Sequence, residues 1–291
     1  MIIEKPDDVT AAVLQEMHRT PDARTKELLT LLVRHLHAFV REARLTEREF
    51  QDAIGLVNAI GQHSTASHNE AMLMAGSLGV SNLVCLTNNG AGGTRPTQAN
   101  NLGPFYRADA PRCANGDSIV RSPTPGAALA FRGWVRDANG APIAGAEVDV
   151  WQSSPAGLYE NQDPTQADMN LRGRFVTEAD GSFGFVSVKP AGYPVPVDGP
   201  TGALLAAQNR HNLRPAHIHF LIHKPGYKTI ASQVYDPQDP NLETDSQFGV
   251  TRALIGEFVS RGAGYALEFT FVLEPGESRR PRAPISGKAT G

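Results

Sequence analysis

The sequence predicts an all-β sandwich preceded by an α-helical N-terminal domain, and two observations support this fold class. Apolar residues recur at helical spacing through the first hundred residues. After about Gly103, short runs rich in β-branched and aromatic residues alternate with turn dipeptides and proline-rich loops, which is typical of an antiparallel sandwich. We therefore expect a helical domain and linker over residues 1–100, the sandwich over 101–275, and a loose tail, poor in apolar residues, over 276–291.

The helical domain carries recognisable start and stop signals. Thr20-Pro21 has the form of an N-cap followed by proline at the first helical position, ahead of an amphipathic run over residues 25–44. Capping-box patterns at residues 46–49 and 67–70 precede apolar runs over 50–60 and 71–86. The helical pattern ends at Asn88-Asn89-Gly90, and the Gly- and Thr-rich stretch to Asn101 is expected to be a linker.

One helix has an apolar face broader than a small sandwich contact needs. The face is formed by Leu28, Leu32, Leu36 and Phe39. We expect it to be buried in a symmetric homodimer, so the helical domain is interpreted as a dimerisation domain. The histidines of these helical segments are expected to be solvated or packed residues: His35, His37, His63 and His68.

The sandwich strands are expected as β-type runs on either side of turn dipeptides. The runs occupy residues 131–137, 146–152, 174–178 and 182–188. Asn139-Gly140 separates the first pair and Asp180-Gly181 the second, and both dipeptides predict a hairpin or tight turn.

Composition excludes several classes of protein. The chain has 291 residues, 41% of them hydrophobic and 20% charged, which is ordinary for a globular protein with a sizeable core. A net charge of -3 gives no electrostatic case for a nucleic-acid partner. No apolar run approaches the roughly 18 residues of a membrane span, and no secretory signal is visible. We expect a cytoplasmic protein whose two cysteines, Cys85 and Cys113, are reduced.

The segment Arg214-Pro215-Ala216-His217-Ile218-His219-Phe220 carries the strongest chemical signal. In a strand, alternate side chains share a face, so His217 and His219 point the same way while Ile218 and Phe220 point into the opposite layer. Two imidazoles on one face can hold one metal ion. A lone His-x-His is a weak signal, because two polar residues on a half-buried strand give the same pattern.

Two tyrosines lie in loops that restrict their conformation. Tyr159 follows the expected strand 146–152, and Tyr193 lies in a loop with prolines at 190, 194, 196 and 200. A loop so stiffened loses little entropy when it positions a side chain, although two aromatic residues packed at a sandwich rim would fit equally.

Two phenolates with two neutral imidazoles are a donor set suited to ferric iron. Phenolate oxygen is a hard, anionic donor, and only a strong Lewis acid would keep two tyrosines ionised near neutral pH. The set leaves Fe(III) with one positive charge, which a bound hydroxide would neutralise. Zinc more usually takes histidine with cysteine or carboxylate, and none is placed beside His217.

An ordered set of motifs resembles a known family. The segments GLYENQ (157–162), YPVPVDGP (193–200), RPAHIHF (214–220) and Ser232-Gln233-Val234-Tyr235-Asp236 are similar, in order and separation, to those of intradiol ring-cleaving dioxygenases of the catechol 1,2-dioxygenase and hydroxyquinol 1,2-dioxygenase group. The likeness covers nearly the whole chain. It implies an all-β catalytic sandwich with an α-helical dimerisation domain, one non-haem Fe(III) per subunit, a catechol-type substrate with O2, and room for a bound lipid in the helical region.

The resemblance also implies residue roles. Tyr159 and His217 would be equatorial iron ligands and Tyr193 and His219 axial ones, with Tyr193 leaving as a neutral phenol when the diol binds. Arg214 would stabilise charge on the substrate, and Gln233 would be a polar neighbour in the same catalytic set. The substrate pocket would be lined by Leu73, Gly76, Gly103, Pro104, Phe105, Pro194 and Gln247.

The resemblance leaves the substrate open. Phe105 after Gly-Pro, and Gln247-Phe248-Gly249, are closer to hydroxyquinol enzymes. Gly76 argues against hydroxyquinol, because a glycine leaves space and removes an acceptor for a third hydroxyl, and on this residue we rank catechol ahead of hydroxyquinol. Residues 133–146 resemble non-enzymatic prealbumin-like binding modules, which is the alternative of another class.

Overall fold

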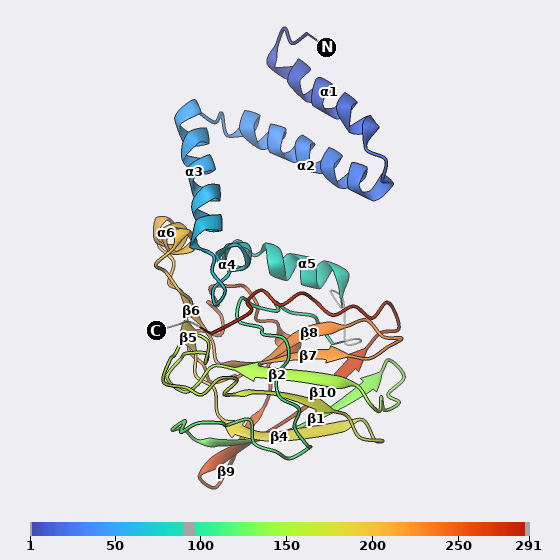
Figure 1. The fold of residues 1–291 in the computed structure, drawn as a ribbon, viewed down its shortest axis with the longest axis vertical. Helices are drawn as coiled ribbons and strands as arrows, with labels where there is room; N and C mark the ends of the chain where they lie inside the picture. Colours follow the sequence, from blue (N-terminus) through green and yellow to red (C-terminus); the bar gives the residue numbers. More distant parts are fainter. Residues whose placement is uncertain (1, 90–96, 289–291) are drawn as a thin grey trace. The chain divides into compact units, whose positions relative to one another are not determined.

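The computed structural model describes residues 2–89 and 97–288, and the chain divides into two compact units, residues 1–58 and 59–291. The expected domain boundary near residue 100 differs from this division. Two helices expected in the N-terminal domain, Glu70–Ser77 and Val80–Asn88, belong instead to the second unit, which contains the sandwich. The first unit contains α1 (Pro6–Glu16), a short 3-10 turn (Met17–Arg19), α2 (Ala23–Glu42) and most of α3 (Glu47–His63) (Figure 1).

The caps of these helices follow the sequence in part. Thr46 and Glu49 form the expected capping box, since each side chain bonds the backbone N–H of the other. Helix α2 begins later than expected: its N-cap is Asp22, whose carboxylate accepts from the Thr25 N–H at 2.7 Å, and not Thr20. An aspartate supplies this acceptor as well as a threonine does.

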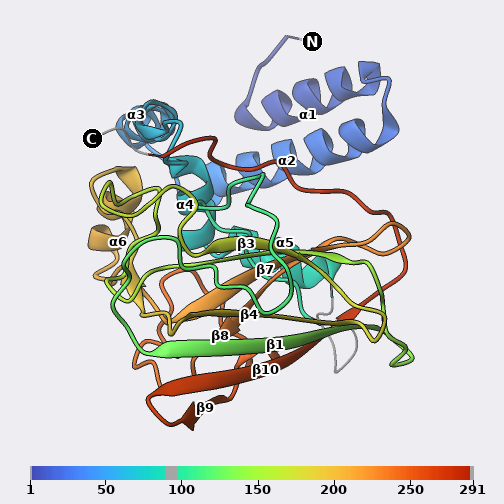
Figure 2. The ribbon, with the colours of Figure 1, turned by 60° about the horizontal axis from the view of Figure 1, so that its bottom comes forward.

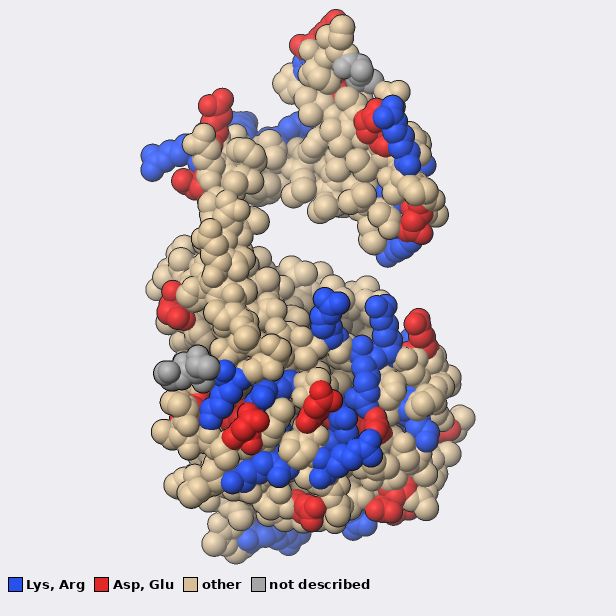
Figure 3. All heavy atoms as spheres, viewed as in Figure 1, with Lys and Arg blue, Asp and Glu red and all other residues tan. Residues whose placement is uncertain are grey.

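The apolar face of α2 is exposed within this chain. Leu28, Leu32, Leu36 and Phe39 are 49%, 53%, 52% and 57% exposed. On the face drawn in Figure 3 the helices of this unit carry wide stretches without charged side chains. Among the described residues, no single helix combines the length and the apolar character of a membrane span, whereas a bent pair of helices, Glu70–Ser77 and Val80–Asn88, passes on length and composition alone.

The second unit opens with α4 (Glu70–Ser77) and α5 (Val80–Asn88), and α6 (Pro200–Ala207) follows later in the chain. Asn69 caps α4 by accepting from the Met72 N–H at 2.8 Å. The capping box expected from Ser67 is therefore wrong by two residues. Helices α4 and α5 lie beside the sheet that contains β7 (His217–His223) and β8 (Ile230–Tyr235) (Figures 1 and 2).

Two four-stranded sheets form the sandwich, as the sequence predicts. One has the order β4-β1-β10-β9, from Ser182–Val188, Ala128–Asp137, Gly264–Leu273 and Phe258–Arg261. The other has the order β3-β2-β7-β8, from Arg172–Val176, Glu147–Gln152, His217–His223 and Ile230–Tyr235. A two-stranded pair, β5 (Tyr193–Pro194) and β6 (Leu213–Arg214), lies at one edge, and a 3-10 turn spans Arg252–Leu254. All strand pairs are antiparallel except β1 with β10.

The two expected turns are present, but they connect different sheets. Gly140 and Gly181 have φ of 85° and 78°, so the turns at Asn139-Gly140 and Asp180-Gly181 use the glycine as expected. The strands they join, β1 with β2 and β3 with β4, belong to opposite layers. These turns are corners of the sandwich and do not close hairpins.

Side chains from both sheets fill the core. Ile218, Phe220 and Ile222 of β7 enter it, so the alternation expected for this strand is confirmed. A second apolar cluster surrounds the opposite face of β7 and includes Trp151, Tyr159 and Tyr193. That face positions the candidate site.

The C-terminal segment differs from the expected loose tail. Residues 276–288 run along the sandwich toward α4 (Figures 1 and 2), and Ile285 is buried. Ser286 N–H donates to Ala66 O at 2.9 Å, and the Asn69 amide donates to Pro284 O at 3.2 Å. The segment is polar in composition, which predicted a loose tail, but Ala283 and Ile285 make apolar contacts that hold it against the protein.

Candidate functional site

His217 and His219 lie on one face of β7 with their Nε2 atoms 3.1 Å apart. Both side chains are buried, and Trp151 of the neighbouring strand β2 stacks on His219 at 4.6 Å between ring centroids. Because β2 is paired with β7 and places Trp151 opposite His219, the sheet register fixes the orientation of this imidazole.

The hydrogen bonds of His217 determine its tautomer. Its Nδ1 lies 2.7 Å from Pro215 O, a carbonyl that can only accept, so Nδ1 carries the proton and Nε2 presents a lone pair. Burial and the charge of Arg214 lower the pKa of His217 to about 3, and burial lowers the pKa of His219 well below its usual value. Both imidazoles are therefore neutral near pH 7, as metal ligation requires.

The two tyrosines come together although 34 residues separate them. Their hydroxyl oxygens are 3.4 Å apart, Tyr193 lies 5.6 Å from His217 and Tyr159 6.3 Å from His219 between ring centroids. Burial raises the pKa of Tyr159 well above its usual value in the metal-free protein. The four side chains thus gather at one buried point, which is the convergence that strand parity and the loop motifs predict.

A buried ionic network fixes the loop that carries Tyr159. Glu160 accepts from Arg172 Nε at 2.6 Å and from Arg107 Nη1 at 2.5 Å. Arg172 also donates to the Asn161 side chain at 3.1 Å and lies over the Tyr159 ring. Such a paired and hydrogen-bonded network holds Tyr159 in place.

Arg214 is buried beside the two histidines and makes several hydrogen bonds. Its Nε and Nη2 contact the two carboxylate oxygens of Asp245 at 3.0 and 3.1 Å, and Nη2 also donates to Gln233 Oε1 at 3.0 Å. Its Nη1 is 3.3 Å from His217 Nε2. Burial opposes the charged form, but Asp245, Tyr235 and Tyr193 together outweigh burial and raise the pKa of Arg214 well above its usual value, so the guanidinium is permanently charged.

A cavity of about 270 Å³ opens next to this cluster. Of the residues expected to line it, Leu73, Gly76, Gly103, Pro104, Phe105 and Gln247 do so, together with Tyr193 and Arg214. Pro194 does not: it is exposed, and its neighbour Val195 lines the cavity instead, because successive side chains of an extended chain point to opposite sides. Gln233 is buried behind the cavity wall, where it accepts from Arg214 and donates to Asn101 O at 2.7 Å.

Two glycines allow close approaches in the cavity. Gly103 has φ +76°, and a Cβ there would meet His219 Cε1 at 3.2 Å. A Cβ on Gly76 would lie 2.0 Å from Gln247 Oε1. The space that Gly76 leaves is therefore filled by an amide, which corrects the expectation that this position lacks an acceptor.

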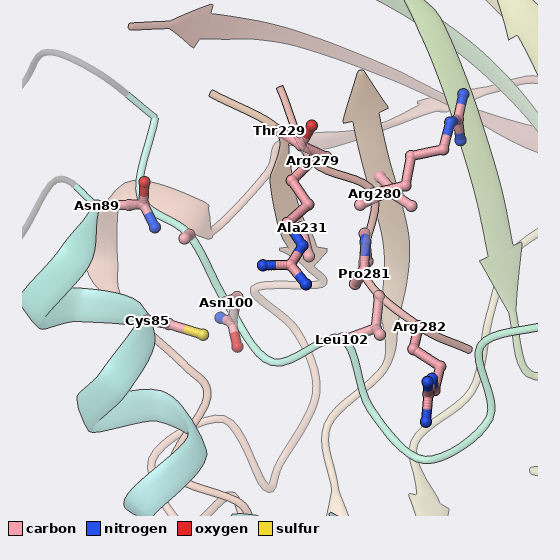
Figure 4. A pocket seen from close by; sticks show the side chains of 12 residues that line it. Cys85, Asn89, Asn100, Leu102, Thr229, Ala231, Arg279, Arg280, Pro281 and Arg282 are labelled. Atoms are coloured by element: carbon pink, nitrogen blue, oxygen red, sulfur yellow. The ribbon is translucent and has the colours of Figure 1, made fainter. Parts of the chain in front are cut away.

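A second cavity, of about 560 Å³, adjoins the first and shares Cys85, Leu102, Pro281 and Arg282 with it. Figure 4 shows its walls, formed by α5, the segment 99–102, the start of β8 and the arginine-rich C-terminal segment. Arg280 is paired with Glu147 and Asp149. In the part of the chain described, Arg279 and Arg282 have no acidic partner, so the mouth of the site is positively charged.

Sequence reasoning missed several residues of the site. Asp245, which holds Arg214, and Cys85, Asn101, Val195 and Arg282, which line the cavity, were not expected. Asp245 stands two residues before Gln247, and its nearness to an expected pocket residue was the only available signal. Arg282 fell in the segment expected to be loose.

Comparison with known proteins agrees with this geometry. Residues 102–275 match the family described as Dioxygenase, and residues 22–93 match the family described as Catechol dioxygenase N terminus. The chain is 40% identical to 6-chlorohydroxyquinol 1,2-dioxygenase of Cupriavidus pinatubonensis over 92% of this chain and 97% of that protein. It is 38% identical to catechol 1,2-dioxygenase of Candida albicans over 86% of this chain and 83% of that protein.

Solved structures give the same result. The crystal structure of hydroxyquinol 1,2-dioxygenase from Pseudomonas putida DLL-E4 superimposes with a TM-score of 0.82 at 34% identity, covering 93% of this chain and 99% of that chain. The first family match spans residues 133–146, which carried the resemblance to binding modules. The chain therefore belongs to the intradiol ring-cleavage dioxygenases, oxidoreductases of aromatic-compound catabolism, in the group of catechol and hydroxyquinol 1,2-dioxygenases.

Proposed function

We propose that this chain cleaves hydroxyquinol between its two adjacent hydroxyls, using O2 and one non-haem ferric ion, to give a hydroxylated cis,cis-muconate. Both oxygen atoms of O2 enter the product, which is a dicarboxylate. The observation that carries the choice of substrate is the Gln247 amide in the space beside Gly76.

The four clustered donors fit ferric iron. His217 presents an Nε2 lone pair, and His219 Nε2 faces it at 3.1 Å. Two tyrosine oxygens 3.4 Å apart supply anionic donors at the same buried point. We infer that Tyr159, Tyr193, His217 and His219 hold the ion. When bound, the iron supplies the Lewis acidity that promotes ionisation of the diol and its reaction with O2.

Tyr193 is proposed as the ligand that receives a proton from the substrate. It lines the cavity, whereas Tyr159 is held behind it by the Arg172–Glu160 network. A proton on Tyr193 Oη would convert it to a neutral phenol and free a position for the diol. Arg214, charged at all relevant pH values and aimed at His217 Nε2, would stabilise the negative charge that develops on the bound ring.

The pocket chemistry favours a third hydroxyl on the substrate. Gln247 Nε2 donates to Ser77 Oγ at 2.6 Å, which fixes the amide. Within residues 2–89 and 97–288, Gln247 Oε1 accepts no hydrogen bond, and it lies in the cavity wall against Gly76. An unpaired acceptor at this position would be satisfied by the third hydroxyl of hydroxyquinol and left unpaired by catechol.

Catechol is the second candidate. The rest of the wall is apolar at Leu73, Leu102 and Phe105, and it would accept an unsubstituted ring equally well. The ranking drawn from the sequence placed catechol first on Gly76 alone, and the filled space at Gly76 removes that reason.

The test is direct. Iron-loaded protein should be coloured by tyrosinate-to-iron charge transfer, take up O2 with hydroxyquinol, and yield a product that contains both atoms of labelled O2. The ratio of kcat/KM for hydroxyquinol over catechol should exceed ten. A colourless iron-loaded protein without O2 uptake would refute the intradiol assignment, whereas a ratio below one would refute only the choice of substrate.

We also propose that two chains associate through the apolar face of α2. The four half-exposed side chains of this face, Leu28, Leu32, Leu36 and Phe39, would be buried by a second copy. Sedimentation at micromolar concentration should give a dimer, and Leu32→Glu should shift it toward monomer. The change Arg34→Gln, at an exposed position on the opposite side of the helix, should not.

A further inference from the structure

A cluster of two histidines and one glutamate lies apart from the tyrosine–histidine site. His63 ends α3, His68 lies in the following loop, and Glu70 begins α4. One donor atom from each residue lies within 4.8 Å of the other two. The His63 and His68 rings are 5.5 Å apart and edge-on. The cluster borders a cavity of about 390 Å³ that also contacts Phe105 and Asn161.

Glu70 is an unusual member of this cluster because its carboxylate is only 1% exposed. Oε1 accepts from the Thr201 N–H at 2.7 Å, and Oε2 lies 2.6 Å from His68 Nε2. In the described ranges 2–89 and 97–288, no lysine or arginine is paired with it. Buried carboxylates are normally paired with a cation or bound to a metal, so a buried carboxylate held here by a backbone N–H and an imidazole is a candidate metal ligand.

The donor set matches a borderline divalent ion. Two imidazole nitrogens and one carboxylate are the protein ligands of many zinc sites. A fourth donor is close, since Asp198 Oδ2 is 3.5 Å from His63 Nε2. The Thr201 N–H would hold the other carboxylate oxygen of Glu70, as outer contacts commonly do around a bound metal. Donors around tetrahedral zinc are about 3.4 Å apart, so the partly exposed His63 and His68 would rotate to reach that spacing when the ion binds.

We propose that His63, His68 and Glu70, completed by Asp198, form a second metal site that binds a divalent ion of the zinc class. In the metal-free protein the same side chains contact one another in pairs, with His68 Nε2 2.6 Å from Glu70 Oε2 and His63 Nε2 3.5 Å from Asp198 Oδ2. The donors differ from those of the tyrosine-containing site: they lack phenolate, so they favour zinc over ferric iron.

The site would connect three segments that meet near the catalytic pocket. It links the end of α3 and the start of α4 to the proline-rich loop, because Asp198 stands five residues after Tyr193 in that loop. Gly199 makes the approach possible, since a Cβ there would lie 2.8 Å from both Glu70 Oε1 and His63 Nε2. Bound zinc should therefore stabilise the sandwich unit against heat.

The experiment uses iron-loaded protein, so that the tyrosine–histidine site is already filled. Calorimetric titration with zinc chloride should give one additional zinc per chain, with no iron released as measured by elemental analysis. Loss of a residue that only contacts a metal ligand weakens metal affinity roughly 10- to 100-fold. Because His63 and His68 are proposed as direct ligands, His63→Ala and His68→Ala should each weaken zinc affinity by more than this. The matched control is His35→Ala, an exposed helical histidine, which should leave zinc affinity unchanged.

Two results would overturn the proposal. In the first, the double variant His63→Ala, His68→Ala binds zinc with the same affinity as the wild type. The second is an anomalous zinc peak at the tyrosines, with iron displaced, instead of between His63 and Glu70. Glu70→Gln is a less useful variant, because it alters a buried acceptor of the Thr201 N–H and can lower stability for that reason alone.

Discussion

Alanine at position 76 should move the Gln247 amide and change substrate preference. The new Cβ would lie 2.0 Å from Gln247 Oε1 and 3.1 Å from its Cδ, and outside its own helix its three nearest atoms all belong to the Gln247 side chain. The contact is with the end of a flexible side chain, so the amide rotates away and its 2.6 Å hydrogen bond to Ser77 is lost. The backbone has no reason to shift.

The magnitude follows from one hydrogen bond. An acceptor lost from a substrate hydroxyl costs about 1–3 kcal/mol, so the ratio of kcat/KM for hydroxyquinol over catechol should fall about 10- to 100-fold in Gly76→Ala. Stability should change by less than about 1 kcal/mol, because alanine is the better helix former in α4. The measurement is steady-state O2 uptake with both substrates, alongside urea unfolding.

Two further variants make the result specific. Gln247→Leu removes the acceptor without adding bulk at position 76 and should reproduce the shift. Gly61→Ala is the matched control, because a Cβ on this helical glycine meets nothing within 4 Å. A ratio that stays within about twofold of wild type in both Gly76→Ala and Gln247→Leu would show that Gln247 does not contact the third hydroxyl.

Three other outcomes are expected. Arg214→Ala should lower turnover by about 100-fold or more while iron is retained, since its guanidinium stabilises developing charge; unchanged turnover at full iron content would exclude that role. The metal-free protein should lose up to about 5 kcal/mol of unfolding free energy as pH falls from about 6.5 toward 3. The reason is that His217 has a pKa of about 3 in the folded state, so the unfolded state takes up the proton first. Urea unfolding across this pH range measures the change, and an unfolding free energy independent of pH would contradict the prediction. Replacing Arg279 and Arg282 together by glutamine should weaken inhibition by the dicarboxylate product severalfold and make that inhibition less dependent on salt. The control Arg261→Gln, on β9, should have neither effect. Equal product inhibition constants for the double variant and the wild type would show that the basic mouth does not bind product.

Local patterns predicted the parts of this protein that depend on near neighbours. The 3.6-residue spacing of apolar residues predicted α2 and α3, and the alternation at 217–220 placed His217 and His219 on one face away from the core. The capping box at Thr46 and the turns at Gly140 and Gly181 were also correct, because each depends on a few consecutive backbone angles.

Contacts between distant segments were decided by the tertiary structure. A turn dipeptide reverses the chain but does not say which sheet the next strand joins, so both turns became corners between layers. Tyr159 and Tyr193 were known as a pair only from the motif order, and their 3.4 Å approach depends on the packing of two loops.

The same reason explains the residues that sequence reasoning missed or misplaced. Asp245 reaches Arg214 across 31 positions, and Gln247 enters the space at Gly76 from across 171 positions. The C-terminal segment looked loose because its composition is polar, yet a few side chains such as Ile285 dock it beside the pocket. By itself the sequence determined the elements, the shared face of His217 and His219, and the chemistry of the donors. Only tertiary packing decided which side chains fill the space around the substrate. The residues that meet there come from distant parts of the chain, and no periodic pattern in the sequence predicts contacts between such distant residues.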